Sequence, residues 1–333
     1  MRTDKFNEEK WMAAVLGLII GDALGVPAEF KSRLELRNNP VTGMEGFGSH
    51  NQPAGTWSDD SSMVLATIEW FAEMVASAPD YKMLMEKFCK WFLYGDYTPH
   101  GVVFDCGIST SRAIMNYGNG TEPLQCGGCS EWENGNGSLM RILPAALWYS
   151  KELAEEENIA LESIFKLSSL THGHMRSKIG CLLYSKMVAD LLFNIGNDKS
   201  TVINNSVLSI KNCLESSYYN ESLLELGYFN RLWDPDFKTL AEGEIRSSGY
   251  VVDTLEAAVW CFLTTETYKD CVLKAVNLGE DTDTVGAVAG GLAGAFYGME
   301  EIPTEWISKL ARLKWIEAMV TNMVNRKKEM YER

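Results

Sequence analysis

Apolar residues recur at the spacing of a helix along most of this chain, and no run of strand length alternates polar and apolar residues persuasively. One such stripe consists of Val64, Ile68, Phe71 and Val75. The pattern predicts helices over residues 8–22, 59–78, 81–94, 105–117, 138–150, 158–171, 174–195, 201–217, 251–265, 267–277, 284–298 and 303–328. Glycine, proline and asparagine gather between them, at residues 38–55, 118–137, 196–200 and 227–249. The sequence therefore predicts an all-α fold.

The chain gives no sign of a boundary between domains. No Ser/Gly linker, low-complexity run or fixed-period repeat interrupts its 333 residues. A hydrophobic content of 46% is ample for a buried core. We expect a single compact domain over residues 1–333, with the last apolar helix packed back onto the body.

The predicted helix that begins near Thr284 is rich in glycine, with Gly286, Gly290, Gly291 and Gly294 among apolar residues. A glycine costs a helix about 1 kcal/mol relative to alanine. Several in one helix indicate that its backbone must approach other helices closely. We expect a central helix whose N-terminus lies deep in the molecule.

The charge and the apolar segments limit the possible partners. A net charge of −15 argues against nucleic acids and anionic membranes, because the field would repel phosphate groups. Residues 12–20 are apolar but lack the basic region and cleavage site of a signal peptide. Residues 284–297 are shorter than the roughly twenty that a membrane span needs. We expect a cytoplasmic protein without a membrane partner.

Two acidic clusters with flanking hydroxyls stand far apart in the sequence. They comprise Ser58, Asp59 and Asp60 in the first cluster, and Asp281, Asp283 and Thr284 in the second. Either cluster alone has an ordinary explanation, because acidic residues in a first turn complement the helix dipole. Neighbouring carboxylates nevertheless repel one another unless a positive charge lies between them. Two oxygen-rich clusters of one design therefore predict a binuclear site for Mg²⁺ or Mn²⁺.

Two further segments carry candidate functional groups. Gly21, Gly25 and Pro27 break a helix and leave Glu29 in a turn, as a surface carboxylate or as a general base or nucleophile in a cleft. The Gly/Asn loop at residues 134–138 opens a helix and exposes backbone N–H groups to an anion or to sugar hydroxyls. Taken alone, this loop is an ordinary turn.

Most of the eight cysteines lie singly in apolar helical patterns and are expected to be core residues. Cys126 and Cys129 are the exception, in a Cys-Gly-Gly-Cys sequence. A zinc site would need a second pair or suitably spaced histidines, and none is evident. A redox pair and a surface loop with reduced thiols remain the two interpretations.

Seven motifs follow one another along the chain. They are GDALGVPAEF at 21–30, GTWSDDSSM at 55–63, FDCG at 104–107, NGNGSLMR at 134–141, LTHGH at 170–174, SSGYVVDTLEAAVWCFL at 247–263 and GEDTDTVGAVAGGLAGAFYG at 279–298. In this order they resemble the ADP-ribosylglycohydrolases, from about Trp11 to Tyr297. The layout looks closest to the bacterial, arginine-directed members of that family.

The resemblance implies an orthogonal all-α fold with two divalent cations in a central cleft. It implies that the family's metal ligands correspond to Ser58, Asp59, Asp60, Asp281, Asp283 and Thr284. Ser58 departs from the commoner threonine but keeps the hydroxyl oxygen. Glu29 matches the glutamate beside the scissile bond, and Asp105 matches a further acidic residue at the cleft.

The same resemblance implies a substrate pocket. Its residues are Asn136, Gly137 and Ser138 in the loop that holds the distal ribose or the phosphates, then Met140, His172, Gly249, Tyr250 and Val251 along the ADP-ribose pocket. Without the resemblance, His172 would pass as a helix C-cap or a surface group. Tyr250 would pass as a core aromatic, although a stacking platform for adenine is chemically reasonable.

The implied reaction is hydrolysis of the glycosidic bond at C1 of the distal ribose in an ADP-ribosylated acceptor. Such cleavage builds positive charge on the sugar, which an acidic cleft suits. Glu29 would take a proton from water or steady the developing cation. We favour arginine on protein as the acceptor, although serine, a nucleic-acid base and a small ADP-ribose derivative stay open.

Other kinds of protein fit the sequence less well. A di-metal phosphohydrolase usually offers His-Asp pairs, and no histidine here precedes an aspartate. A prenyl-diphosphate enzyme needs D-D-x-x-D, and Met63 occupies the last position. A non-catalytic ADP-ribose-binding or crystallin-like protein on the same scaffold is the remaining alternative.

Overall fold

The computed structural model describes residues 8–75, 79–155, 158–193, 198–216 and 220–331. Its α-helices are α1 (Glu8–Gly25), α2 (Arg33–Asn38), α3 (Asp59–Ala72), α4 (Tyr81–Tyr94), α5 (Ile108–Gly118), α6 (Leu143–Trp148), α7 (Ser150–Ala154), α8 (Asn158–Ser169), α9 (Met175–Phe193), α10 (Lys199–Ser216), α11 (Asn220–Leu226), α12 (Val251–Leu263), α13 (Tyr268–Val276), α14 (Thr282–Tyr297), α15 (Thr304–Lys309) and α16 (Leu313–Tyr331). Short 3₁₀ turns are η1 (Gly48–His50), η2 (Pro123–Gln125), η3 (Gly227–Trp233), η4 (Phe237–Thr239), η5 (Glu242–Glu244) and η6 (Met299–Glu301). No β-strand occurs in these ranges, so the predicted all-α class is confirmed.

Most predicted helices are present with shifted ends, and two short ones were missed. The missed helix α2 begins with a capping box, in which Ser32 and Glu35 each bind the other's backbone N–H. The missed helix α11 follows α10 closely. Predicted residues 76–78, 194–195 and 217 lie outside the described ranges.

Two predicted helices are each divided in the structure. The one expected at 138–150 begins only at Leu143, with Pro144 in its first turn, and continues after a break as α7. The one expected at 303–328 is interrupted between α15 and α16. There Arg312 takes a left-handed conformation (φ 51°), and the Ala311 N–H donates to the Gly55 carbonyl oxygen at 3.1 Å. Tertiary hydrogen bonding therefore ends a helix that periodicity alone would continue.

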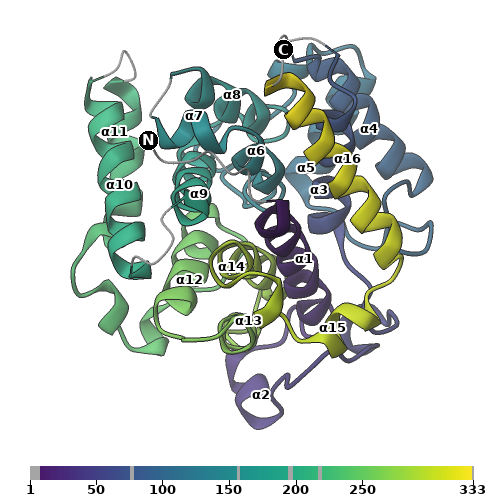
Figure 1. Ribbon diagram of the computed structural model, residues 1–333, viewed down its shortest axis with the longest axis vertical. Helices are drawn as coiled ribbons and strands as arrows, with labels where there is room; N and C mark the ends of the chain where they lie inside the picture. Colours follow the sequence, from purple (N-terminus) through teal and green to yellow (C-terminus); the bar gives the residue numbers. More distant parts are fainter. Residues whose placement is uncertain (1–7, 76–78, 156–157, 194–197, 217–219, 332–333) are drawn as a thin grey trace.

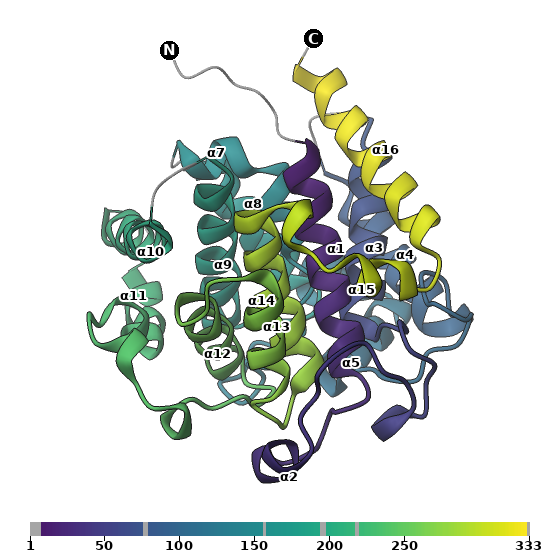
Figure 2. The same ribbon diagram turned by 60° about the horizontal axis from the view of Figure 1, so that its bottom comes forward.

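Helices α1 and α14 lie side by side at the centre of the molecule (Figures 1 and 2). A Cβ at Gly17 would lie 2.5 Å from the Gly290 carbonyl oxygen, and one at Gly286 would lie 2.6 Å from that of Gly21. These backbones touch because glycine has no side chain. The close approach predicted for the glycine-rich helix is confirmed.

The pairing of Gly17 with Gly290 and of Gly21 with Gly286 makes the two helices antiparallel. The C-terminal end of α1 therefore meets the N-terminal end of α14. The Thr282 hydroxyl donates to the Gly25 carbonyl oxygen at 2.8 Å and closes this end of the contact. The register of two apolar helices thus decides which acidic residues become neighbours.

The remaining helices pack around this central pair. Helix α9 is buried along almost its whole length, with α8 and α10 against it. Helix α16 packs across α3, so the last helix returns to the body as expected (Figure 1). Helices α12 and α13 cover α14. The extent of a single domain over residues 1–333 stays a prediction.

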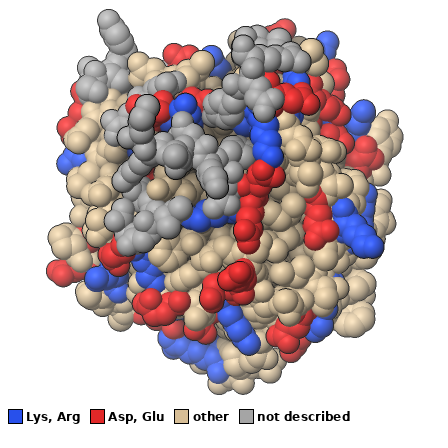
Figure 3. Space-filling model, in the orientation of Figure 1, with Lys and Arg blue, Asp and Glu red and all other residues tan. Residues whose placement is uncertain are grey.

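The outer surface carries both signs of charge. On the face shown in Figure 3, acidic and basic side chains are interspersed around a broad uncharged area. No described helix has both the length and the hydropathy required for a membrane span.

The cysteines are all free thiols. Cys126 is buried, and its thiol contacts the carbonyl oxygens of Thr121 and Glu122, whereas Cys129 is exposed. The geometry favours the loop interpretation of the Cys-Gly-Gly-Cys sequence, with Gly127 packed against the backbone of residues 169–172.

Candidate active site

Asp22 joins the end of α1 to the beginning of α3. Its carboxylate accepts the backbone N–H groups of Ser58 at 2.9 Å and Ser61 at 3.0 Å, and also the Ser61 hydroxyl at 2.5 Å. The first N–H groups of a helix have no partner within the helix and attract negative charge. Asp22 therefore fixes the start of α3, where Asp59 and Asp60 stand.

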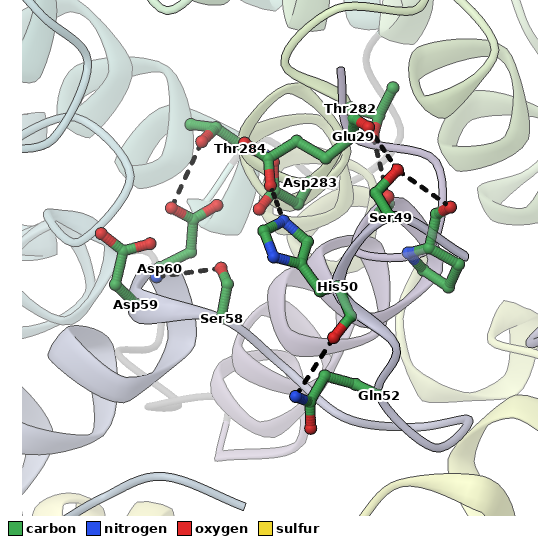
Figure 4. Close-up of polar contacts among 12 residues, drawn as sticks. Glu29, Ser49, His50, Gln52, Ser58, Asp59, Asp60, Thr282, Asp283 and Thr284 are labelled. Atoms are coloured by element: carbon green, nitrogen blue, oxygen red, sulfur yellow. Dashed lines mark hydrogen bonds and ion pairs between the residues drawn. The ribbon is translucent and has the colours of Figure 1, made fainter. Parts of the chain in front are cut away.

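Asp22, Asp60 and Asp283 form one buried carboxylate group, each offering an oxygen within 4.8 Å of the others. Asp60 lies in the first turn of α3 and Asp283 in the first turn of α14. The Thr284 hydroxyl donates to Oδ1 of Asp60 at 3.3 Å, a contact drawn in Figure 4. Ser58 caps α3 by accepting the Asp60 N–H at 3.3 Å.

Glu29, Asp281 and Asp283 form a second carboxylate group that shares Asp283 with the first. Two turns hold it in place. Phe30 and Glu280 both take left-handed conformations (φ 65° and 64°), and the Phe30 N–H donates to the Glu280 carbonyl oxygen at 2.8 Å. A left-handed residue other than glycine costs about 1–2 kcal/mol. The surrounding structure sustains this strain beside two of the candidate residues.

Glu29 also belongs to a third group, with His50 and Asp105. His50 reaches Glu29 from a tight hairpin, in which the Phe47 N–H donates to the Gln52 carbonyl oxygen at 2.5 Å. A hydrogen bond joins His50 Nε2 to a Glu29 carboxylate oxygen (Figure 4). Glu29 therefore links the acidic interior of the site to its more exposed rim.

Burial and mutual repulsion both act on the pKa values of these acids. Burial raises the pKa of Asp22 to about 6, although hydrogen bonds from Ser61 and Ser58 oppose the rise. Burial and the nearby acids also raise the pKa of Asp60 and of Asp283 well above the usual range. Burial raises the pKa of Glu29 to about 7 against the hydrogen bond from His50.

The donor set of the first two carboxylate groups fits divalent cations. Oδ2 of Asp60 is buried and has no hydrogen-bond partner among the described residues. Across the same ranges no lysine or arginine forms an ion pair with Asp22, Asp60 or Asp283. Hard oxygen ligands without a balancing side chain are the set that Mg²⁺ and Mn²⁺ accept. The clusters could hold divalent metal ions.

Asp59 lies beside these groups and faces another element. Its carboxylate accepts the Gly107 N–H at 3.3 Å, just before α5. Burial and the charge of Asp105 raise the pKa of Asp59. Asp59 thus connects α3 to the segment that carries Asp105. A helix was predicted from Asp105, but α5 begins only at Ile108.

Asn136 connects the Gly/Asn loop to the second carboxylate group. Its side-chain amide donates to Oδ2 of Asp281 at 2.7 Å and to the Thr254 hydroxyl at 2.9 Å. Its backbone N–H donates to the Gly249 carbonyl oxygen at 3.0 Å. The loop and the turn before α12 therefore meet the acidic clusters.

Three predicted substrate residues have side chains that face inward. The Ser138 hydroxyl contacts Ser168 and Cys181, and the Met140 side chain is buried in the core. His172 lies beneath the loop, where a Cβ at Gly137 would come within 2.8 Å of its ring. Burial lowers the pKa of His172 to about 3, so the ring is neutral and supports the loop. Gly137 itself leaves room for that ring.

The turn before α12 holds the last predicted residues. Gly249 stands next to Asp281, since a Cβ there would lie 3.2 Å from its Oδ2. The Val251 N–H donates to the Asn134 carbonyl oxygen at 3.0 Å. Arg176 donates to the Tyr250 hydroxyl at 3.1 Å and so fixes the half-buried ring.

Two residues of the site were not singled out from the sequence. Asp22 had a usable signal, because a charged residue inside the apolar stretch at 11–28 must be buried with partners. His50 had none, because it stands between two predicted helices, in a segment that no helical pattern orients.

Comparisons with known proteins identify a family and several relatives. The model of a family described as ADP-ribosylglycohydrolase matches residues 3–333. The chain is 32% identical over 322 residues to ADP-ribosylarginine hydrolase Tri1 of Pseudomonas putida (strain GB-1), covering 96% of this chain and 79% of that protein. It is also 32% identical over 309 residues to the ADP-ribosyl-[dinitrogen reductase] glycohydrolase of Rhodospirillum rubrum. That match covers 91% of this chain and 90% of the other protein.

A solved structure is similar as well. It is described as an ADP-ribosylglycohydrolase-related protein complex, with a TM-score of 0.75 and 27% identity. The match covers 96% of this chain and 98% of the other.

Proposed function

The chain belongs to the ADP-ribosylglycohydrolase family, a family of hydrolases, and on this premise we propose that it releases ADP-ribose from modified arginine on proteins. The observation that carries the proposal is that acids from opposite ends of the chain meet in two carboxylate groups, with Asp283 in both and Glu29 in the second. Two relatives named for ADP-ribosylarginine and for dinitrogen reductase support a protein-bound arginine acceptor.

The bond to be cut is the glycosidic bond at C1 of the distal ribose. Its cleavage develops positive charge on the sugar ring, and a cleft lined by carboxylates stabilises that charge. Glu29 would orient a water molecule or accept its proton, because its carboxylate lies between the interior acids and the rim. Asp105 lies on the rim side of Glu29 and would face the acceptor.

We propose that two Mg²⁺ or Mn²⁺ ions complete the site. Asp60, Asp283 and Thr284 would hold them together with Ser58, Asp59 and Asp281, and Asp22 would orient the start of α3. Bound cations would supply positive charge to orient ribose hydroxyls and to polarise an oxygen. The residues of the chain bind and position the substrate around them.

We propose that the loop at residues 134–138 binds the anionic part of the substrate. A pyrophosphate dianion approaches a protein of net charge −15. The loop offers backbone N–H groups, and its conformation is held by Asn136 and by the neutral His172 below. Backbone amides bind anions without adding a mobile charge. We assign the distal ribose or phosphate contacts to this loop, and the adenine to Tyr250.

The direct test is release of free ADP-ribose from an ADP-ribosyl-arginine peptide, measured by chromatography with Mg²⁺ and with EDTA. We expect release that depends on the metal. Release only from an ADP-ribosyl-serine peptide would reject the arginine acceptor. Tight binding of ADP-ribose without release under any metal would instead support a non-catalytic binder.

Glu29→Gln tests the catalytic residue. Loss of a general base should lower turnover by about 10²–10⁴-fold, while calorimetry should show ADP-ribose affinity within a few-fold of the original. Glu35→Gln is the matched control, because this exposed glutamate lies in the capping box of α2, which glutamine also satisfies. Lost ADP-ribose binding by a folded Glu29→Gln variant would indicate a positioning role.

A further inference from the structure

We propose that Phe30, His50 and Phe104 form the subsite for the acceptor side chain, and that this subsite selects a planar cation, the guanidinium of arginine, over a neutral acceptor. The inference rests on the proposed function, since it names the part of the same site that would recognise the acceptor. It assigns the specificity of the reaction to residues outside the carboxylate clusters.

The three rings form a continuous wall beside the catalytic carboxylates. The centroids of Phe30 and His50 are 5.6 Å apart with planes tilted by 54°. Those of His50 and Phe104 are 5.1 Å apart with planes tilted by 53°. Phe30 follows Glu29 in the chain, and Phe104 precedes Asp105. The wall therefore runs from one rim carboxylate to the other.

The position of the Phe30 ring is not explained by core packing. Its side chain is 72% exposed, although its backbone holds a left-handed conformation at φ 65°. The N–H of Phe30 donates to Glu280, so the turn that shapes the acidic cluster also presents this ring to solvent. An exposed phenylalanine in a strained turn at a site is the arrangement expected for ligand contact.

The chemistry of the wall matches a guanidinium group. Guanidinium stacks on aromatic faces and donates paired hydrogen bonds to carboxylates. Both kinds of partner are present, because Glu29, His50 and Asp105 have polar atoms within 4.8 Å of one another along the ring wall. A serine hydroxyl or an acyl group carries no charge to attract. The net charge of −15 also favours the approach of a cationic acceptor.

The test compares two acceptors in Phe30 variants. Phe30→Leu should lower kcat/KM for an ADP-ribosyl-arginine peptide about tenfold, mainly through KM. For an ADP-ribosyl-serine peptide, the same variant should change kcat/KM by less than about twofold. The inhibition constant of free ADP-ribose should also change by less than about twofold. Phe30→Tyr keeps the ring face and should restore the wild-type preference. Equal losses on both peptides, or no loss on either, would overturn the subsite.

Phe193→Leu is the matched control. Phe193 is also an exposed phenylalanine (41% exposed), but it is the last residue of α9, and its ring takes no part in the proposed wall. It should leave both kinetic values unchanged, and a loss equal to that of Phe30→Leu would reject the assignment.

A second measurement separates this inference from the proposed function. Agmatine, a small guanidinium compound, should bind the wild-type protein, and it should bind the Phe30→Leu variant much more weakly. Ligand-detected NMR measures both. If the wild type cleaves no arginine linkage yet binds agmatine through Phe30, the reaction fails and the subsite stands. If it cleaves arginine linkages and Phe30→Leu changes nothing, the reaction stands and the subsite fails.

Discussion

The carboxylate side of the site and the loop side are built in opposite ways. On the first, Asp22, Asp60 and Asp283 crowd together in the interior, and one oxygen of Asp60 has no partner among the described residues. On the second, the Asn136 amide and backbone are bound by Asp281, Thr254 and Gly249. Buried charge that lacks a partner is costly, whereas a satisfied polar network is stable by itself. The loop is preformed, and in our proposal cations complete the carboxylate side.

This comparison predicts that the two sides respond differently to mutation. A carboxylate removed from the first should abolish the reaction while relieving repulsion in the metal-free protein. A polar group removed from the second should weaken substrate binding and leave metal binding intact.

The largest effect is expected for Asp60→Ala and Asp283→Ala. Each should lower turnover by roughly 10³-fold or more, as for other groups that act as a unit. The same variants should melt at a higher temperature than wild type in EDTA, because one buried charge is gone. They should also lose the rise in Tm that Mg²⁺ gives the wild type, measured by calorimetry.

Asp270→Asn is the control for these variants, since Asp270 is an exposed aspartate in the first turn of α13. It should keep wild-type turnover and the Mg²⁺ response. Near-normal rates in Asp60→Ala or Asp283→Ala would remove that residue from the metal site.

A smaller effect is expected for Asn136→Ala. The variant loses the hydrogen bonds to Asp281 and Thr254 that hold the loop. KM for the arginine peptide should rise about tenfold, since two hydrogen bonds to polar partners contribute about 1–3 kcal/mol, while the Mg²⁺-induced rise in Tm stays within about 1 °C of wild type. A lost metal response would contradict the separation of the two sides.

The smallest effect is the pH dependence of stability. In the folded state the pKa is about 6 for Asp22 and about 7 for Glu29, above their usual values of 3.8 and 4.5. The metal-free fold therefore binds more protons than the unfolded chain between about pH 4 and 7, and these two groups contribute stability that is lost as pH rises through that window.

Saturating Mg²⁺ should cancel this loss, because bound cations favour the ionised acids. The difference in Tm between Mg²⁺ and EDTA should grow from pH 5 to pH 8, by about 2 °C for each 1 kcal/mol in a chain of this length. A difference that shrinks with pH would contradict the assignment.

Sequence patterns were sufficient for the class of fold and for most of its parts. Periodicity located the long helices, and the glycines of α14 indicated a close backbone contact. Periodicity could not locate the break between α15 and α16, because that break depends on a hydrogen bond from Ala311 to Gly55. It also could not reveal α11, a short helix beside α10.

The candidate site was likewise predictable from the sequence only in part. Residue types and order identified Asp60, Asp283 and Glu29 as candidates. Asp22 was within reach of the sequence, as the charged residue of an apolar helix. His50 was not, because only the folded hairpin brings its ring against Glu29.

The sequence alone determined that this chain is helical, that its acids fall into two clusters, and that it resembles the ADP-ribosylglycohydrolases. These properties are local, since propensity, spacing and motif order need no knowledge of distant contacts. Only the tertiary structure decided which acids meet, that Oδ2 of Asp60 has no partner among the described residues, and which rings stand beside Glu29. Those properties depend on the antiparallel register of α1 and α14, where one helical turn of displacement would separate Asp22 from Asp283.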